Sequence, residues 1–224
     1  MGQFRTLGTM PVEVTAYELP PIGTQCYLVS NPELKAFAVF DAPMEAWPVA
    51  QDHAARTGYR LDGLYFTHGH WDHTLDGKHF NEAGIPCFAH PQEKPFFETP
   101  GIMSAFSIPG LEIPEIDIGT WLEHGQQLEI VGARVEIRHV PGHSQGSILY
   151  WFIDDKFAIT GDAIFSGSIG RTDFPGCSFA QLQQSIREQV YTLPDDTVLY
   201  PGHGPETSVG GEAASNPFVK RRTV

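Results

Sequence analysis

Residues 67–73 read THGHWDH and place three histidines and one aspartate in seven positions. His68 and His70 are separated by one residue, so an extended backbone directs both side chains to the same face. Asp72 and His73 follow where the chain leaves the strand-like run LDGLYFT, and α/β folds position functional side chains at such strand ends. Neutral imidazoles and carboxylates are the ligands expected for zinc, manganese or iron. The segment therefore predicts a metal site.

Three further candidate ligands lie where a predicted strand gives way to a turn: His143 in HVPGHSQGS, Asp162 in AITGDAIF and His203 in LYPGHGPE. A single aspartate or histidine in such a place is usually a turn residue. The tripeptide Pro-Gly-His occurs twice, however, at 141–143 and at 201–203, and this repetition favours a shared role. We therefore expect these side chains to converge with residues 68–73 on one rim of the fold.

The elements that must position these side chains are short strands separated by helices. Runs rich in β-branched and aromatic residues predict strands at 12–19, 25–30, 35–41, 61–67, 85–90, 196–200 and several between 126 and 160. Helices are predicted at 46–58, ending at Gly58, at 75–84, and at 178–193 with Ser178 as the N-cap. Two strand-rich halves of this kind predict two β-sheets packed face to face with helices outside.

The composition is that of a folded, acidic protein. Its 224 residues are 41% hydrophobic and 12% aromatic, enough to bury a sizeable core. The formal net charge of -13 argues against a nucleic-acid partner, and an anionic substrate would need a local cation. Cys26, Cys87 and Cys177 show no CxxC spacing, which favours reduced thiols and a cytoplasmic location.

We expect neither a signal peptide nor a membrane-spanning segment in this sequence. The N-terminus has no continuous apolar stretch, and no apolar run approaches the ~20 residues that span a bilayer. Gly2 and Thr6 match a myristoylation pattern, but that pattern is short and common by chance, so we do not expect a lipid anchor. We expect residues 1–224 to form a single domain, and the sequence leaves the oligomeric state open.

The candidate ligands, in chain order, resemble the metallo-β-lactamase superfamily, whose H-x-H-x-D-H motif is matched by residues 68–73. The resemblance covers nearly the whole chain and implies an α/β fold, an αββα sandwich of two mixed β-sheets with helices on the outer faces. It also implies two divalent metal ions, zinc being favoured and iron or manganese being alternatives. The family pattern gives one ion to His68, His70 and His143, the second to Asp72, His73 and His203, and the bridging position to Asp162.

Such a set has a clear chemical use. Two dications about 3.5–4 Å apart share a bridging hydroxide and polarise a carbonyl group. The two dications carry four positive charges, and Asp72, Asp162 and a hydroxide carry three negative charges. The net charge of one positive unit favours a developing oxyanion. Asp72 and Asp162 are therefore the candidate catalytic residues, acting with a metal-bound hydroxide.

Within the superfamily, GRTDFPG at 170–176 and the later PGHGPET and NPF resemble the glyoxalase II-like branch. Typical members hydrolyse glutathione thioesters such as S-lactoylglutathione. Arg171 matches a cation that the branch offers to glutathione, whereas Asp173 stands where an aromatic residue is expected. Only about twenty residues follow His203, so we expect no C-terminal helical domain that grips glutathione. The resemblance thus implies a short hydrolase of a small-molecule thioester.

Three alternatives stay open. A related persulfide dioxygenase would hold one iron on His68, His143 and Asp162, although the presence of every second-metal ligand favours the hydrolase. A lactonase would use the same hydroxide, and a non-catalytic metal-binding protein is the remaining class. For Arg171 the alternative to substrate binding is an ion pair with Asp173 that ties down its own loop.

The segment 98–119 is long, interrupted by proline and glycine, and rich in apolar residues. Loops of this kind are usually functional or mobile. We predict that it borders the metal cleft, with Ile102, Met103 and Phe106 forming an apolar wall. The alternative is a loop that covers one side of the core. Of the histidines outside the candidate set, His53 and His79 are expected at the surface.

Overall fold

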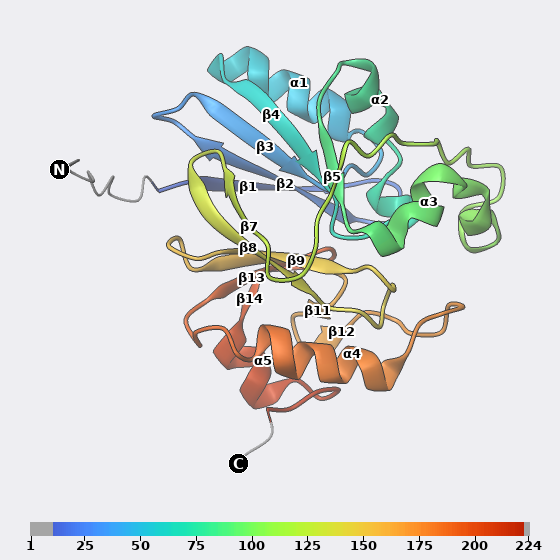
Figure 1. The fold of residues 1–224 in the computed structure, drawn as a ribbon, viewed down its shortest axis with the longest axis vertical. Coiled ribbons are helices and arrows are strands. Elements are labelled where there is room, and N and C mark those ends of the chain that lie inside the picture. Colours follow the sequence, from blue (N-terminus) through green and yellow to red (C-terminus); the bar gives the residue numbers. More distant parts are fainter. Residues whose placement is uncertain (1–10, 222–224) are drawn as a thin grey trace.

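Two six-stranded β-sheets face each other in the computed structural model, which describes residues 11–221 (Figure 1). The first sheet has the order β1 (Glu13–Leu19), β2 (Thr24–Asn31), β3 (Ala36–Phe40), β4 (Arg60–Tyr65), β5 (Cys87–Ala89), β6 (Thr120–Trp121). The second has the order β14 (Thr207–Ser208), β13 (Val198–Pro201), β10 (Phe157–Gly161), β9 (Ile148–Phe152), β8 (Ala133–His139), β7 (Gln127–Ile130). The Gly2 and Thr6 pattern and the rest of residues 1–10 lie outside the described part.

Both sheets mix parallel and antiparallel pairs, as expected. In the first sheet β1, β2 and β3 pair antiparallel, and β3 to β6 continue in parallel. In the second sheet only β10 and β13 are parallel. A small hairpin of β11 (Ile164–Phe165) and β12 (Ser168–Ile169) follows β10. The predicted sandwich of two mixed sheets is therefore confirmed.

The main core lies between the two sheets. Strand side chains alternate between faces, so every second residue of the central strands points inward. Val29 and Phe40 of the first sheet meet Val135, Tyr150 and Ile159 of the second in one buried cluster. The central strands β2, β3 and β10 are buried along their whole length. Burial on both faces explains why β3 and β10 are almost continuously apolar, whereas β2 has apolar residues in its middle and buried polar residues at both ends.

Helices cover the outer face of each sheet (Figure 1). The helices α1 (Ala46–Thr57) and α2 (Gly77–Glu82) pack on the first sheet, and α4 (Phe179–Ser185) and α5 (Val209–Ser215) pack on the second. Ser178 caps α4 by accepting a hydrogen bond from the Gln181 N–H, as predicted. A π-helical turn, Ile186–Val190, extends α4. Gly58 ends α1 with φ 72°, a left-handed conformation that glycine adopts without strain.

The segment 98–119 divides into two parts. Its first part follows α3 (Lys94–Glu98) as a 3-10 helix, Pro100–Phe106, and buries Met103 against Trp71. Further along, Ile116 and Ile118 pack into the core on the outer face of the first sheet. The second part of the segment therefore matches the alternative interpretation, a loop that covers one side of the core.

The prediction that His53 is a surface residue is wrong. His53 shares the inner face of α1 with Ala46 and Ala50, which are seven and three residues before it. Its ring lies edge-on to Phe37 at 4.7 Å, and its Nε2 is 3.1 Å from the Ser30 hydroxyl. His79 is exposed on α2, as expected.

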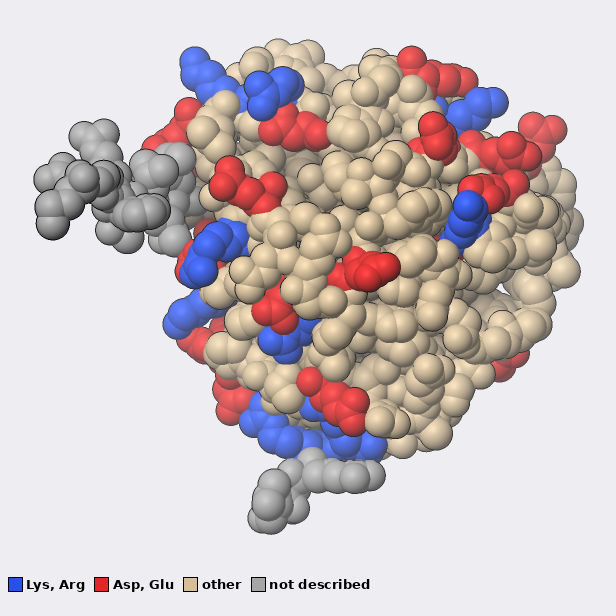
Figure 2. All heavy atoms as spheres, in the orientation of Figure 1, with Lys and Arg blue, Asp and Glu red and all other residues tan. Residues whose placement is uncertain are grey.

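Acidic and basic side chains lie mixed on the face shown in Figure 2, without the continuous basic surface that phosphate backbones require. No helix between residues 11 and 221 is long and apolar enough to cross a membrane. All three cysteines have free thiols.

Candidate metal centre

The seven predicted ligands meet at one edge of the sandwich, where strands of both sheets end. Residues 67–73 follow β4 of the first sheet, and the other candidates follow β8, β10 and β13 of the second. A backbone hydrogen bond from the Ile148 N–H to the Thr67 carbonyl joins the two sheets beside the site. Convergence of strand ends thus brings together side chains that are far apart in the sequence.

Their ligand atoms form three overlapping groups, and within each group all ligand atoms lie within 4.8 Å of one another. The groups are His68, His70 and His143; His68, His73 and Asp162; and Asp72, His73 and His203. The first and third coincide with the two triads that the sequence resemblance implies. Asp162 lies between them, with its carboxylate oxygens 3.3 Å from His73 Nε2, 3.5 Å from His143 Nε2 and 3.6 Å from His203 Nε2.

Several of these ligand atoms have no hydrogen-bond partner. The Nε2 atoms of His68, His73 and His143 and the Oδ1 atom of Asp162 are buried and unpaired. Each unsatisfied buried polar group costs roughly 1–3 kcal/mol, so an arrangement that holds four of them together needs a compensating ligand. Divalent cations satisfy imidazole nitrogens and carboxylate oxygens of this kind. The residues present therefore fit a pair of metal ions.

In three of the histidines the other ring nitrogen, Nδ1, contacts an oxygen atom of the protein, which fixes the orientation of the imidazole. Nδ1 of His73 lies 2.8 Å from Asp41 Oδ2, and Nδ1 of His143 lies 2.8 Å from the Arg171 carbonyl oxygen. Nδ1 of His203 lies 3.2 Å from the Gly23 carbonyl oxygen. Each contact leaves Nε2 to face the centre of the site.

Burial keeps three of the histidines neutral, which is the form that binds metal ions. Burial, together with the neighbouring histidines, holds the pKa of His68 well below its usual value. Burial lowers the pKa of His70 to about 3 and also lowers the pKa of His143. These imidazoles are neutral at pH 7 and need not release a proton to coordinate a metal ion.

His73 behaves differently because carboxylates surround it. Burial alone lowers its pKa, but Asp72, Asp162 and Asp41 outweigh burial and raise that pKa well above the usual value. Burial of Asp162 is likewise outweighed, chiefly by His73, so the pKa of Asp162 falls. This half of the site therefore has an excess of negative charge that favours a cation.

Asp41 was missed by the sequence reasoning. It ends the predicted strand 35–41, is buried, and accepts hydrogen bonds from the Thr67 N–H and hydroxyl, both at 2.8 Å. Because it also contacts His73, Asp41 fixes both the start of the ligand segment and one ring within it. A carboxylate directly after a buried strand was the available signal.

Glu93 was missed as well, and nothing in its sequence context marks it. Its fully buried carboxylate accepts hydrogen bonds from the Gly69 N–H at 2.7 Å, the Gly146 N–H at 2.6 Å and the Ser144 hydroxyl at 2.5 Å. Burial raises its pKa, and these three hydrogen bonds oppose that rise. Glu93 thus fastens the ligand segment of the first sheet to the His143 turn of the second.

The N-terminal strands close the other side of the site. Thr24 forms a β-bridge with His203, and its hydroxyl donates a hydrogen bond to Asp72 Oδ2 at 2.9 Å. The Gln25 N–H donates to the Gly202 carbonyl at 2.7 Å. A Cβ atom at position 202 would overlap Asp162 Oδ1, which explains the glycine of the second Pro-Gly-His turn.

Arg171 borders the cavity above the candidate ligands, but its guanidinium group is engaged. It makes two contacts of 2.7 Å with the Asp173 carboxylate and lies 4.1 Å above the Phe174 ring. This geometry matches the alternative role, in which Arg171 ties down its own loop. Binding of substrate by Arg171 stays a prediction.

The loop does bring an aromatic ring to the site, although Asp173 occupies the position where one was expected. Phe174, one residue later, lies edge-on to His70 at 5.3 Å between ring centres. Asp173 does occupy the expected position, but the loop conformation turns the neighbouring Phe174 toward the site.

Two adjoining cavities open onto the site. One, of about 360 Å³, lies above the candidate ligands, and the other, of about 220 Å³, lies beside His70. Met103 and Phe106 line both cavities, and Ile102 lines the smaller one. The prediction that these three residues form an apolar wall of the cleft is confirmed for the 3-10 helix.

The chain belongs to the metallo-β-lactamase superfamily, whose family model matches residues 24–203. Hydroxyacylglutathione hydrolase GloC of Haemophilus influenzae is 33% identical over 218 residues, covering 95% of this chain and 98% of that protein. The crystal structure of BLEG-1 B3 metallo-β-lactamase superposes with a TM-score of 0.85 at 29% identity, covering 92% of this chain and 99% of the other. That of TTHA1623 in a di-iron-bound form has a TM-score of 0.80 at 31% identity, covering 92% and 100%. These similarities establish the fold and the superfamily.

Proposed function

We propose that the protein is a dinuclear metallohydrolase that cleaves thioesters. The observation that carries the proposal is the pair of ligand triads that share Asp162 between them, with unpaired nitrogen and oxygen atoms facing inward. The similarity to a hydroxyacylglutathione hydrolase over nearly the whole chain supports a thioester as the substrate. The metal is proposed to be zinc, and the di-iron form of a similar protein keeps iron as an alternative.

In this proposal His68, His70 and His143 would hold one ion, and Asp72, His73 and His203 would hold the other. Asp162, which lies between the two groups, would be shared by both. Such a pair of ions, when bound, activates water near neutral pH and polarises a carbonyl oxygen. The chain contributes the orientation of the ligands: Asp41 holds the His73 ring, and Thr24 holds the Asp72 carboxylate by a hydrogen bond.

Thioester chemistry suits a site of this composition. An alkyl thiol has a pKa of about 8.5, so a thiolate leaves without a side-chain acid to protonate it. The chain then has to hold the acyl carbonyl at the ligand cluster and limit the access of bulk water. Met103, Phe106 and Phe174, which line the cavity above the ligands, serve that purpose.

A metal count and a turnover assay on the same sample test the proposal. We expect about two metal ions per chain and hydrolysis of thioesters that is lost on chelation and regained with zinc. The assay panel includes lactones and persulfides. About one iron per chain with persulfide oxidation and no thioester hydrolysis would replace the proposal with the dioxygenase alternative.

A further inference from the structure

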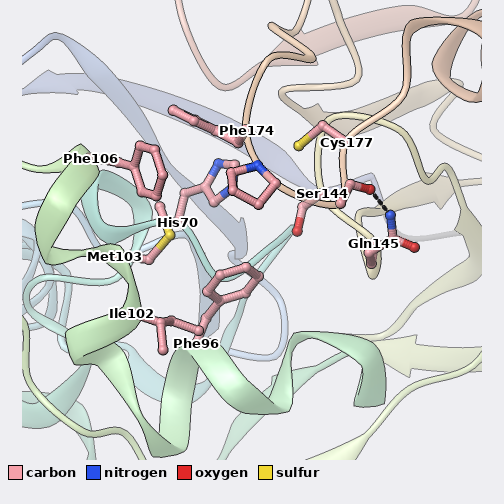
Figure 3. Close-up of a pocket in the computed structure, with 11 residues that line it drawn as sticks. His70, Phe96, Ile102, Met103, Phe106, Ser144, Gln145, Phe174 and Cys177 are labelled. Atoms are coloured by element: carbon pink, nitrogen blue, oxygen red, sulfur yellow. Dashed lines mark hydrogen bonds between the residues drawn. The ribbon is translucent and has the colours of Figure 1, made fainter.

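The smaller cavity lies between the 3-10 helix and the loop that follows Arg171 (Figure 3). Ile102, Met103 and Phe106 form one side, and Phe174 and Cys177 form the other. His70 stands between these two sides, so the cavity opens directly beside a candidate metal ligand. A group bound there would be continuous with a carbonyl held at the ligand cluster.

Apart from the His70 ring, the polar side chains that line this cavity already make hydrogen bonds within the protein. The Ser144 hydroxyl donates to Glu93, the Cys177 thiol donates to the His143 carbonyl, and the Gln145 amide donates to the Gly176 carbonyl. No charged side chain is among the lining residues, all of which belong to the described part of the chain. The cavity therefore offers apolar surface and few free hydrogen-bonding groups to a ligand.

Three neighbours fix the Phe174 ring, which lines the cavity on the side of the loop. Its ring centre lies 5.0 Å from that of Phe106 and 5.3 Å from that of His70, and the Arg171 guanidinium covers its face. Arg171 is held in turn by Asp173. Arg171 is thus placed to act as a positioning residue for the cavity wall.

We infer that this cavity binds the acyl group of the substrate and selects apolar acyl groups over small hydroxyacyl groups. The inference rests on the proposed thioester hydrolysis and names its substrate class. A volume of about 220 Å³ equals that of about seven water molecules, which suits an acyl chain of similar size. The larger, more open cavity, which Arg171 and His203 border, leaves room for the bulkier and more polar thiol.

A series of thioesters on one neutral thiol, N-acetylcysteamine, tests the inference with the metal-loaded protein. The acyl groups are acetyl, lactoyl, butanoyl, hexanoyl and phenylacetyl. We expect kcat/KM to rise by up to roughly fourfold for each methylene added from acetyl to hexanoyl, because each buried methylene favours binding by a similar factor. Lactoyl should be no better than acetyl.

Two tryptophan substitutions on the same helix give a matched comparison. Ile102→Trp places a large ring at the cavity, whereas Ala105→Trp adds the same ring at an exposed position outside the lining. We expect Ile102→Trp to lower the ratio of hexanoyl to acetyl kcat/KM at least tenfold. Ala105→Trp should leave that ratio unchanged. Metal content and melting temperature, measured on both, show whether the site and fold are intact.

The outcomes separate the two proposals. Thioester turnover with no dependence on acyl length, or an equal effect of both tryptophans, would overturn the acyl cavity and leave the hydrolase standing. A clear preference for lactoyl over hexanoyl would also overturn it. If the metal-loaded protein hydrolyses no thioester in the series, the proposed function falls and the acyl assignment falls with it.

Discussion

At the scale of single residues, Asp162 has the most constrained position in the site. Its carboxylate lies between His73, His143 and His203, and the absent side chain of Gly202 leaves room for it. Burial of a carboxylate without a hydrogen-bond partner on one oxygen is costly, and a bound cation would offset that cost.

We therefore expect Asp162→Asn to lose the bridging of two metal ions. An amide neither neutralises the charge nor spans the pair, so metal content should fall from about two ions per chain to one or fewer. Turnover should fall at least about 100-fold, since the residue orders both ions. Elemental analysis and thioester kinetics measure the two effects. Asp196→Asn, which changes an exposed carboxylate paired with Lys156, is the control and should match the parent protein. Two bound metals and near-normal turnover in Asp162→Asn would show that Asp162 is not the bridge.

Substitution of Arg171 distinguishes two roles, positioning of Phe174 and binding of an anionic substrate, because they predict different kinetics. If it positions Phe174, Arg171→Ala should lower kcat/KM for hexanoyl thioesters several-fold whether the thiol is charged or neutral. If it binds an anionic substrate, KM should rise roughly tenfold for anionic thioesters alone, the loss of one charged hydrogen bond.

From the structure we expect the first result, because Nε and Nη2 of Arg171 both donate to the Asp173 carboxylate. Arg134→Ala removes a comparable exposed pair with Asp154 far from the ligand set and serves as the control. An effect confined to anionic thioesters would restore the substrate-binding role predicted from the sequence.

At the scale of elements, periodicity and caps were sufficient to predict most of the sandwich. The long strands carry continuous or alternating apolar residues, and Ser178 and Gly58 mark helix ends by local chemistry that does not depend on the rest of the fold. The two-residue strands β6, β11, β12 and β14 were not predicted, because they are defined only by pairing with other strands. The short helix α5 was missed although Ser208 caps it, because its seven residues include two glycines, which are poor helix formers.

The candidate ligands could be predicted because strand ends and motif spacing mark them, but their supports could not. Asp41 reaches His73 only because β3 and β4 lie side by side in parallel, with Phe40 opposite Tyr65. Glu93 fastens two turns that belong to different sheets, and no local pattern records such a contact. Phe174 was overlooked for a similar reason, since only the loop conformation turns it toward His70.

The Pro-Gly-His turn after β13 provides a prediction at this scale. Gly202→Ala should displace the Asp162 carboxylate and the His73 ring, because the added methyl group would overlap both. We expect reduced metal content and a loss of turnover with retained secondary structure by circular dichroism. Gly119→Ala, whose added methyl would meet nothing closer than a carbonyl oxygen at 3.9 Å, is the control. Full metal occupancy in Gly202→Ala would mean that the turn has more freedom than its packing indicates.

At the scale of the whole molecule, the candidate centre joins the two sheets and should contribute to global stability. A ligand at 100 times its dissociation constant stabilises the folded state by about 2.7 kcal/mol. For a chain of this length that corresponds to roughly 5–10 °C in melting temperature. We expect chelation to lower the melting temperature of the parent protein by such an amount and zinc to restore it. Asp162→Asn should respond much less to chelation, and an equal response of both proteins would place the stabilising metal elsewhere.

The contacts of Thr24 and Gln25 with His203 and Gly202 can form only late in the synthesis of the chain. They join the second strand of the chain to a turn near its far end. At synthesis rates of 5–20 residues per second, the ribosome reaches His203 roughly 6–26 s after His73. Throughout that interval the nascent chain carries the His68–His73 cluster without its partners from the second sheet. The candidate ligand set can therefore come together only after His203 has been synthesised and β13 has joined the second sheet.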